Sequence, residues 1–300
     1  MGDKTKIDWC DSSWNPVTGC LHGCEYCYAR GIANRFGGHL ATLVGKPIKP
    51  DEKKWEMGFE KNHVLDAPMR NTSSYEYMRI AGINAGRKMP YPFDFEPTFH
   101  RYKLDEPQHW KEPRTIFVCS MADLFGAWVP DEWIEEVFKA CTAAPQHRYM
   151  FLTKAPERFK QLLDNGVTFP KNCWFGTSIT RSAEAEKEGA RLDKLTDTWP
   201  VRGVKWFASV EPILENLSDE AVCNLAALDW VIIGAETGRR KNKVIPKKEW
   251  ITHITDHLRY LHVPVFMKKS LREIMGKDFR QEFPWGGSET DAIKKAVKQE

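Results

Sequence analysis

The chain has 300 residues, of which 42% are hydrophobic, and 44 Lys and Arg against 41 Asp and Glu give a formal net charge of +3. This length and apolar content allow a large buried core, in one large domain or two small ones. The near balance of charge excludes a protein whose bulk charge alone directs it to nucleic acid or to membranes.

The N-terminal stretch MGDKTKIDWC contains no apolar run long enough for a signal peptide. No apolar run elsewhere approaches the roughly 20 residues that a membrane-spanning helix needs. We therefore expect a cytoplasmic protein with no membrane partner.

The first strand is expected in SWNPVTG (residues 13–19), followed by a cysteine-rich loop and a helix from Tyr28 to Phe36. Residues 37–113 break this rhythm, because they are rich in Gly, Pro, Lys and aromatic residues and fit neither the helical nor the strand period. We expect them to form one long insertion after the first helix. An ordered insertion of this length acts as a lid or binding region, or as a structural cap on the fold.

From about Arg114 onward, apolar runs alternate with helical patterns. The runs are TIFVCS (115–120), YMFLT (149–153), CWFGTS (173–178), VKWFAS (204–209), WVIIGA (230–235) and VPVFMK (263–268). Helices are expected over residues 131–144, 155–166, 182–195 and 246–262, the first with Asp131 as its N-cap. Continuous apolar runs of this kind are typical of parallel strands that are buried on both faces.

Repeated βα units predict an α/β fold with a parallel sheet, either open and doubly wound or closed into a barrel. Counting the first strand, we expect a partial or complete parallel (β/α) barrel of six to eight strands. The barrel would occupy residues 1–269 and contain the insertion 37–113. Residues 270–300 would form a charged C-terminal extension.

Polar side chains follow each apolar run. They are Ser120 with Asp123, Thr153 with Lys154, Thr177 with Ser178, Ser209 with Glu211, Glu236, and Lys268 with Lys269. Strand ends are generally more polar than strand middles, which explains most of the hydroxyl groups. The carboxylates and lysines are better explained if they converge on one mouth, because functional groups gather at the carboxyl ends of parallel strands.

Three of the eight cysteines, Cys20, Cys24 and Cys27, lie within eight residues directly after the first strand. The others include Cys119, Cys141, Cys173 and Cys223, which lie in apolar sequence and are expected to be small buried hydrophobic residues. A disulfide within the cluster would leave one thiol unpaired. Clustered thiols in a reducing compartment are better explained as metal ligands.

Two metal sites fit these three thiols. A zinc site needs a fourth ligand, which Cys10 or His22 could supply, although zinc sites usually combine two ligand pairs and no second pair exists here. A [4Fe-4S] cluster held by three thiolates leaves one iron open to chelate a small molecule. Gly19 and Gly23 suit a loop that bends tightly around such a group.

The segment Cys20-Leu-His-Gly-Cys24-Glu-Tyr26-Cys27 resembles the signature of the radical S-adenosylmethionine superfamily, including the aromatic residue before the third cysteine. Further blocks resemble a phage- and bacterium-associated three-cysteine-motif family of largely undefined function. These blocks are WNPVTGC, GCEYCYA, IFVCSMADLFG, FLTKAPER, SVEP and DWVIIGAETG.

The resemblance implies roles for particular residues. Cys20, Cys24 and Cys27 would bind a [4Fe-4S] cluster, and the other implied ligands would bind S-adenosylmethionine. These are Tyr26 near the adenine, Ser120, Met121 and Asp123 near the methionine amine, Thr177 and Ser178 near the ribose or carboxylate, and Gly234 and Glu236 at the adenosine pocket. The usual Gly-Gly-Glu segment is not present at 120–123, and the block VFMKKS departs from the family's usual ending after its lysine.

The implied reaction is reductive cleavage of S-adenosylmethionine followed by hydrogen abstraction from a substrate, with an external one-electron reductant of the flavodoxin or ferredoxin type. Lys268, Glu211 or Lys154 would handle a proton or bind a substrate phosphate. Basic clusters near aromatic residues, GRRKNK (238–243) and KPIKPDEKK (46–54), favour a nucleotide or nucleic-acid base as substrate. The alternatives are a peptide or small metabolite as substrate, or a non-catalytic zinc-binding nucleic-acid adaptor.

Overall fold

The computed structural model describes residues 5–37, 63–70, 88–187, 203–238 and 240–285. Much of the predicted insertion, at residues 38–62 and 71–87, lies outside the described residues, and so does the basic cluster at 46–54. The same holds for residues 188–195 of one predicted helix and for residues 286–300 of the predicted extension.

Seven strands form one parallel sheet whose spatial order follows the chain. They are β1 (Ser12–Trp14), β5 (Thr115–Val118), β6 (Arg148–Thr153), β7 (Cys173–Ile179), β8 (Lys205–Val210), β9 (Trp230–Ile233) and β10 (Val265–Met267). Each strand pairs in parallel with the next one along the chain, and the order runs from β1 at one edge to β10 at the other. The predicted fold class is confirmed as a partial (β/α) barrel, and every predicted apolar run overlaps one strand.

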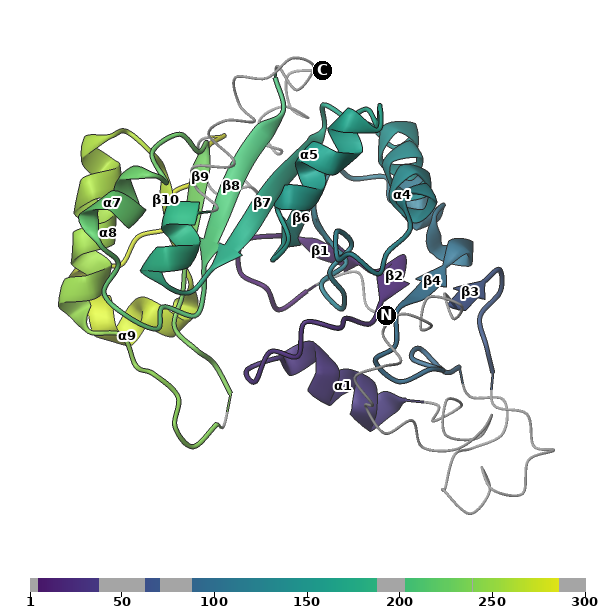
Figure 1. The fold of residues 1–300 in the computed structure, drawn as a ribbon, viewed down its shortest axis with the longest axis horizontal. Helices are drawn as coiled ribbons and strands as arrows, with labels where there is room; N and C mark the ends of the chain where they lie inside the picture. The colour runs from purple at the N-terminus through teal and green to yellow at the C-terminus, as the bar shows by residue number, and fades with distance from the viewer. Residues whose placement is uncertain (1–4, 38–62, 71–87, 188–202, 239, 286–300) are drawn as a thin grey trace.

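The helices are α1 (Tyr28–Phe36), α4 (Asp131–Ala143), α5 (Glu157–Asp164), α7 (Asp219–Cys223), α8 (Lys248–Tyr260) and α9 (Arg272–Met275), with short 3₁₀ helices at Arg101–Lys103, Glu106–His109, Lys269–Leu271 and Gly276–Asp278. The helices α1, α4, α5 and α8 match the predicted ranges to within two residues at each end, whereas α7 and α9 were not predicted. Residues 182–187 are also helical. Figure 1 shows α4 and α5 beside β6 and β7, α7 and α8 beyond β9 and β10, and α1 below the sheet.

The predicted N-cap of α4 is wrong by one residue. Pro130 occupies the N-cap position and Asp131 is the first helical residue. The Asp131 carboxylate accepts hydrogen bonds from Arg158 and, at 3.0 Å, from Asn165 on the α5 side of the molecule. Asp131 therefore ties α4 to α5 instead of capping its own helix.

The single strand predicted over residues 13–19 is two strands that belong to different sheets. β1 ends at Trp14, and β2 (Val17–Thr18) joins a second sheet in the order β2-β4-β3, with β4 at Thr98–His100 and β3 at His63–Leu65. The break falls at Asn15 and Pro16, where proline supplies no backbone N–H for a ladder. The chain therefore leaves the barrel just before the cysteine loop.

The two faces of the main sheet carry separate apolar clusters. Alternate residues such as Ile116, Phe151 and Trp206 pack under the outer helices, whereas Phe117 and Phe207 point into the concave face. Cys119, Cys141 and Cys173 are buried as predicted. Cys223 is exposed on α7, contrary to the prediction.

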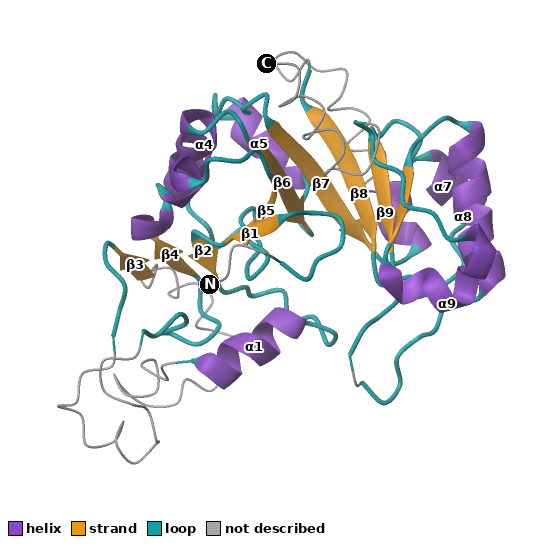
Figure 2. Cartoon of the chain, turned by 180° about the vertical axis from the view of Figure 1, so that it is seen from behind, coloured by secondary structure: helices purple, strands orange, loops and turns teal. Residues whose placement is uncertain are grey.

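Both ends of the described chain cover the concave face. Trp9 joins the concave cluster from the N-terminal side, and Phe283 and Trp285 pack on it from the C-terminal side. Asp8 Oδ2 accepts a hydrogen bond of 2.7 Å from the backbone N–H of Lys269. Residues 270–285, predicted as part of an extension, are thus packed on the barrel, as Figure 2 also shows for α9.

Candidate functional site

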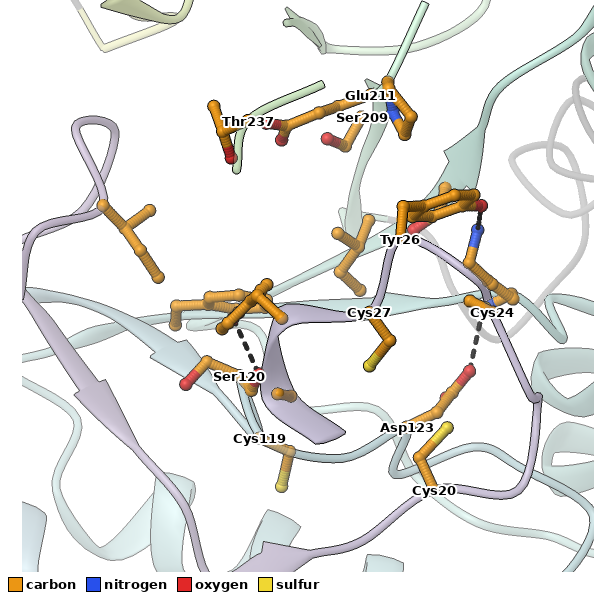
Figure 3. A pocket seen from close by; sticks show the side chains of 18 of the residues that line it. Cys20, Cys24, Tyr26, Cys27, Cys119, Ser120, Asp123, Ser209, Glu211 and Thr237 are labelled. Atoms are coloured by element: carbon orange, nitrogen blue, oxygen red, sulfur yellow. Dashed lines mark hydrogen bonds between the residues drawn. The ribbon is translucent and has the colours of Figure 1, made fainter. Parts of the chain in front are cut away.

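A cavity of about 510 Å³ lies where the carboxyl ends of the strands meet the cysteine loop. Eleven of the sequence-predicted site residues line it, namely Cys20, Cys24, Tyr26, Cys27, Ser120, Asp123, Lys154, Ser178, Glu211, Glu236 and Lys268. Figure 3 shows Cys20, Cys24 and Cys27 on one side of this cavity and Ser209, Glu211 and Thr237 on the opposite side. The strand-end rule therefore brings together residues that lie far apart in the sequence.

The cysteine loop is fixed by backbone contacts. Gly19 has a φ of +90°, and a Cβ atom there would lie 2.2 Å from the carbonyl oxygen of Glu96, so only glycine fits. The N–H of Gly19 donates to the carbonyl of Met121, and the N–H of Cys20 donates to the carbonyl of Phe95. Cys27 ends the loop as the N-cap of α1, with its Sγ accepting from the N–H of Arg30 at 3.4 Å. Backbone hydrogen bonds thus hold the start of the loop, and the Cys27 thiol holds its end.

The chemistry of the donor set fits an iron–sulfur cluster. Cys20, Cys24 and Cys27 are all free thiols that line the same cavity. Burial raises the pKa of Cys20 to about 12, so its thiolate form would need a compensating metal cation. Within the described residues, no three His, Cys, Asp or Glu side chains are grouped so that they could hold one metal ion. The thiolates of a cluster bind separate irons and need not meet at one point.

Asp123 is the hub of the cysteine-loop side of the cavity. Its Oδ1 accepts from the hydroxyl of Thr153 at 2.7 Å and from the N–H of Phe125 at 3.1 Å. Its Oδ2 accepts from the N–H of Lys154 at 2.9 Å and lies 2.7 Å from Nε2 of His22. A carboxylate has about four acceptor positions, so this one is fully used. Asp123 links the ends of β5 and β6 to the cysteine loop, and its contacts leave no acceptor position for a ligand amine.

Lys154 and Tyr26 form a second link between β6 and the cysteine loop. Lys154 Nζ donates to the Tyr26 hydroxyl at 3.1 Å and lies 5.5 Å from the centre of the Tyr26 ring. Burial opposes the charged form of Lys154, but Tyr26, Cys24 and Glu184 together outweigh it and raise the lysine pKa. Lys154 is therefore a charged group that orients an aromatic wall of the cavity.

Lys268 and Glu211 form an ion pair across the ends of β8 and β10. Lys268 Nζ lies 2.6 Å from Oε1 and 2.7 Å from Oε2 of Glu211. A Cβ atom on Gly234 would lie 3.1 Å from both side chains, so glycine leaves room for the pair at the end of β9. Gly234 supports this pair and is not among the cavity-lining residues.

Glu236 is buried at the edge of the cavity and is held by Arg240. Two hydrogen bonds of 2.7 Å, from Nε and Nη2 of Arg240, reach the two carboxylate oxygens. This bidentate contact lowers the pKa of Glu236 and keeps it ionised. The sequence analysis noted Arg240 only as part of the basic cluster at 238–243, and because residues 234–238 and Arg240 are not helical, the i, i+4 spacing gave no signal for its contact with Glu236.

Thr177 does not line the cavity. Its side chain is fully buried, and its hydroxyl donates to the carbonyl of Thr153 at 3.4 Å. Ser178, one residue on, does line it and is the register partner of Ser209 on β8. Thr177 shares the face of Phe175, which packs under the helices, so strand alternation separates the two neighbours.

Several lining residues were not predicted. Lys6, Ile7, Asp8 and Trp9 reach the cavity from the N-terminal segment, and Thr237 follows Glu236. The N-terminal segment precedes the first strand, so the rule that functional groups follow strands gave no reason to select it.

No helix among the described residues is long and apolar enough to span a bilayer.

Comparisons with known proteins give few matches. No curated protein matches the chain. Among solved structures, a double mutant of spore photoproduct lyase with bound AdoMet and dinucleoside spore photoproduct has a TM-score of 0.41 at 12% identity, with 82% of this chain and 60% of that chain covered. A single mutant of spore photoproduct lyase also has a TM-score of 0.41 at 12% identity, with 92% and 78% covered. The chain thus spans 60% of the first of these proteins.

A family model covers nearly the whole chain, from residue 4 to residue 277. The match takes in the cysteine loop, all seven strands of the barrel and every cavity-lining residue. The chain therefore belongs to the family described as "Protein of unknown function (DUF5131)".

Proposed function

We propose that this chain is a radical S-adenosylmethionine enzyme, in which Cys20, Cys24 and Cys27 hold a [4Fe-4S] cluster and the cavity binds S-adenosylmethionine. One observation carries the proposal: the three-thiol loop opens into a cavity at the carboxyl ends of the parallel strands. Three thiolates leave one iron of such a cluster free for a small-molecule ligand. When bound, the cluster and S-adenosylmethionine would supply a 5′-deoxyadenosyl radical, with an external flavodoxin- or ferredoxin-type reductant as electron source.

The residues around the cavity suit separate tasks. Tyr26, oriented by Lys154, offers a flat face beside the cysteines for the adenine ring. Ser178 and Ser209 stand side by side on β7 and β8, where their hydroxyls can bind the ribose or carboxylate. Lys268, paired with Glu211, can hold or move a proton on the far side of the cavity. The concave apolar cluster below excludes water from the reacting centre.

A nucleotide or nucleic-acid base is the substrate class we propose within this function. The basis is the sequence, since one of the two basic clusters that suggest it lies outside the described residues. In the other cluster, Arg240 is engaged with Glu236. Turnover with separate DNA, RNA, nucleotide and peptide pools, followed by the deuterium gained or hydrogen lost, would identify the substrate, and transfer only to peptide would contradict the proposed class.

The cofactor proposal is tested with protein purified without oxygen. We expect brown protein with about four irons per chain, as one cluster requires, and formation of 5′-deoxyadenosine from S-adenosylmethionine with a reductant. Cys24→Ala should abolish both the iron and the cleavage. Cys141→Ala removes a core thiol remote from the cavity and should retain both. Colourless protein with stoichiometric zinc and no cleavage would contradict the proposal and favour the zinc-binding adaptor.

A further inference from the structure

A second set of metal-ligating side chains lies between α7 and α8, away from the cavity. These helices lie side by side in both Figure 1 and Figure 2. α7 presents Asp219 and Cys223, and α8 presents His253 and His257, each pair four residues apart. Residues at i and i+4 share one face of a helix, so each helix directs two ligand-type side chains to the same side.

The four side chains form two cross-helix pairs. Cys223 Sγ lies 3.3 Å from Nε2 of His257, and Asp219 Oδ1 lies 3.3 Å from Nε2 of His253. The two histidine rings have centroids 6.3 Å apart. The two pairs are therefore neighbours on the same helix–helix seam.

These separations are those expected of two ligands on one zinc ion. Zinc bonds of about 2.0–2.3 Å at tetrahedral angles put neighbouring ligand atoms roughly 3.3–3.8 Å apart. Nε2 of His253 is shielded from solvent and makes no hydrogen bond within the described residues, although Asp219 lies within hydrogen-bond distance. Cys223 and His257 meet within hydrogen-bond distance, so His253 is the member of the set whose ring nitrogen lacks a hydrogen bond among the described residues.

We propose that Asp219, Cys223, His253 and His257 bind a zinc-type divalent cation that fastens α7 to α8. As placed, the side chains stand as two separate pairs, in keeping with the lack of a preassembled three-ligand group among the described residues. Asp219 is 84% exposed and Cys223 is also on the surface, so both can rotate toward the histidines. Carboxylate, thiolate and imidazole are all ordinary zinc ligands.

The cation would have a structural role. α7 contains only five residues, far fewer than the number at which an isolated helix is stable in water. A metal bridging α7 and α8 would hold this short helix against its longer neighbour. The site is independent of the proposed function, because none of its four residues lines the cavity.

The test is a Co²⁺ titration of the tag-free full-length chain, compared with Cys223→Ser and with His109→Gln as matched control. His109 is an exposed histidine remote from α7 and α8. Wild type and control should each bind one equivalent more than Cys223→Ser and show the extra thiolate-to-cobalt charge-transfer absorption. The three-cysteine loop is intact in all three proteins, so its metal cancels in the comparison.

In His257→Gln, the affinity of the protein for this additional Co²⁺ should fall at least about tenfold. Removing a residue that only supports a metal ligand already lowers metal affinity by about tenfold or more, so removing a ligand should do no less. Zn²⁺ should raise the unfolding temperature of the wild type more than that of Cys223→Ser. Far-ultraviolet circular dichroism would show that each variant is folded. Equal stoichiometry, equal cobalt spectra and equal zinc-induced shifts in wild type and Cys223→Ser would overturn the proposal.

Discussion

Asp123 lines the cavity as expected, and its contacts in the structure indicate a positioning role. The resemblance to the radical S-adenosylmethionine superfamily implies that Asp123 lies near the methionine amine, and in the structure its carboxylate contacts Thr153, Phe125, Lys154 and His22. A buried carboxylate with such a set of donors is a positioning residue. It holds His22, and with it the middle of the cysteine loop, against the ends of β5 and β6.

Asp123→Asn should therefore loosen the cysteine loop. The amide has one oxygen in place of two, so at least one buried donor loses its partner, which costs about 1–3 kcal/mol of stability. We expect fewer irons per chain after reconstitution and faster hydrogen exchange at residues 20–27. Glu135→Gln on the exposed side of α4 is the control. Iron content equal to that of the control would show that Asp123 does not position the loop.

Gly19 and Gly23 give a matched pair of substitutions in the same loop. Both have positive φ, at +90° and +72°, but only at Gly19 would a Cβ atom collide with backbone, at the carbonyl of Glu96. At Gly23 nothing lies within 4 Å. Gly23→Ala should cost about 1–2 kcal/mol of backbone strain, and Gly19→Ala should cost more. Unfolding midpoints in urea measure the difference, and equal costs would show that the contact with Glu96 yields freely.

The rule that functional groups follow strands selected most of the cavity-lining residues from the sequence. The alternation of side chains between the two faces of a strand was not applied to the last residues of each strand. Thr177 and Ser178 were treated alike, although only Ser178 shares the cavity face. Counting by twos from the buried Phe175 would have separated them. His22 was considered only as a metal ligand, because its contact with Asp123 spans 101 residues and leaves no local signal.

At the scale of elements, long apolar runs were predictable and the second sheet was not. Each barrel strand is buried on both faces, so successive residues are apolar and the strand is visible in the sequence as a continuous apolar run. β2, β3 and β4 have only two or three residues each, and β2 pairs with a strand about 80 residues away. Elements this short show no periodicity, so a single strand was predicted where the chain in fact changes sheets.

The small sheet contains a buried histidine that should make it sensitive to acid. His100 on β4 is fully buried, with Nε2 2.8 Å from the Thr18 hydroxyl of β2. Burial, helped by the charge of Lys103, lowers the pKa of His100 from 6.5 to about 3. Between about pH 6.5 and pH 3, His100 is therefore protonated in the unfolded chain and neutral in the folded chain. Above pH 6.5 this group does not lower the free energy of unfolding. As the pH drops from there toward 3, the free energy of unfolding falls by about 1.4 kcal/mol per pH unit.

His100→Gln removes this titration. Unfolding free energies measured from pH 8 to pH 4 should fall less steeply in the variant than in the wild type. At pH 8 the two proteins differ only by the changed hydrogen bonds, which gives a baseline for the comparison. Parallel pH profiles would show that His100 is not the acid-sensitive group. β2 leads directly into Gly19 and Cys20. As the pH is lowered, the wild type should therefore begin to lose iron at a higher pH than His100→Gln does.

At the scale of the molecule, the open barrel needs something to cover its concave face. β1 and β10 are the two edges of the sheet, and the segments outside them supply the cover. Residues 5–11 cross the concave face before β1 and bond to Lys269 after β10, and Phe283 and Trp285 pack on the same apolar cluster as Trp9. The sequence analysis did not anticipate this cover, because a short segment after the last strand shows no pattern that distinguishes a cover from a tail.

Trp9 is the main apolar contact of the N-terminal cover, which leads to a direct test. Its ring centroid lies 4.8 Å from that of Phe117 and 6.3 Å from that of Trp230, and the residue is 3% exposed. Trp9→Ala should cost about 3–5 kcal/mol, as for other buried aromatic residues. It should also admit water to the cavity that Trp9 lines. Trp250→Ala on α8 truncates a half-buried tryptophan that packs at the edge of the outer cluster, and should cost less. Urea unfolding of both variants measures the difference. A Trp9→Ala cost no larger than that of Trp250→Ala would mean that the barrel is stable without its N-terminal cover.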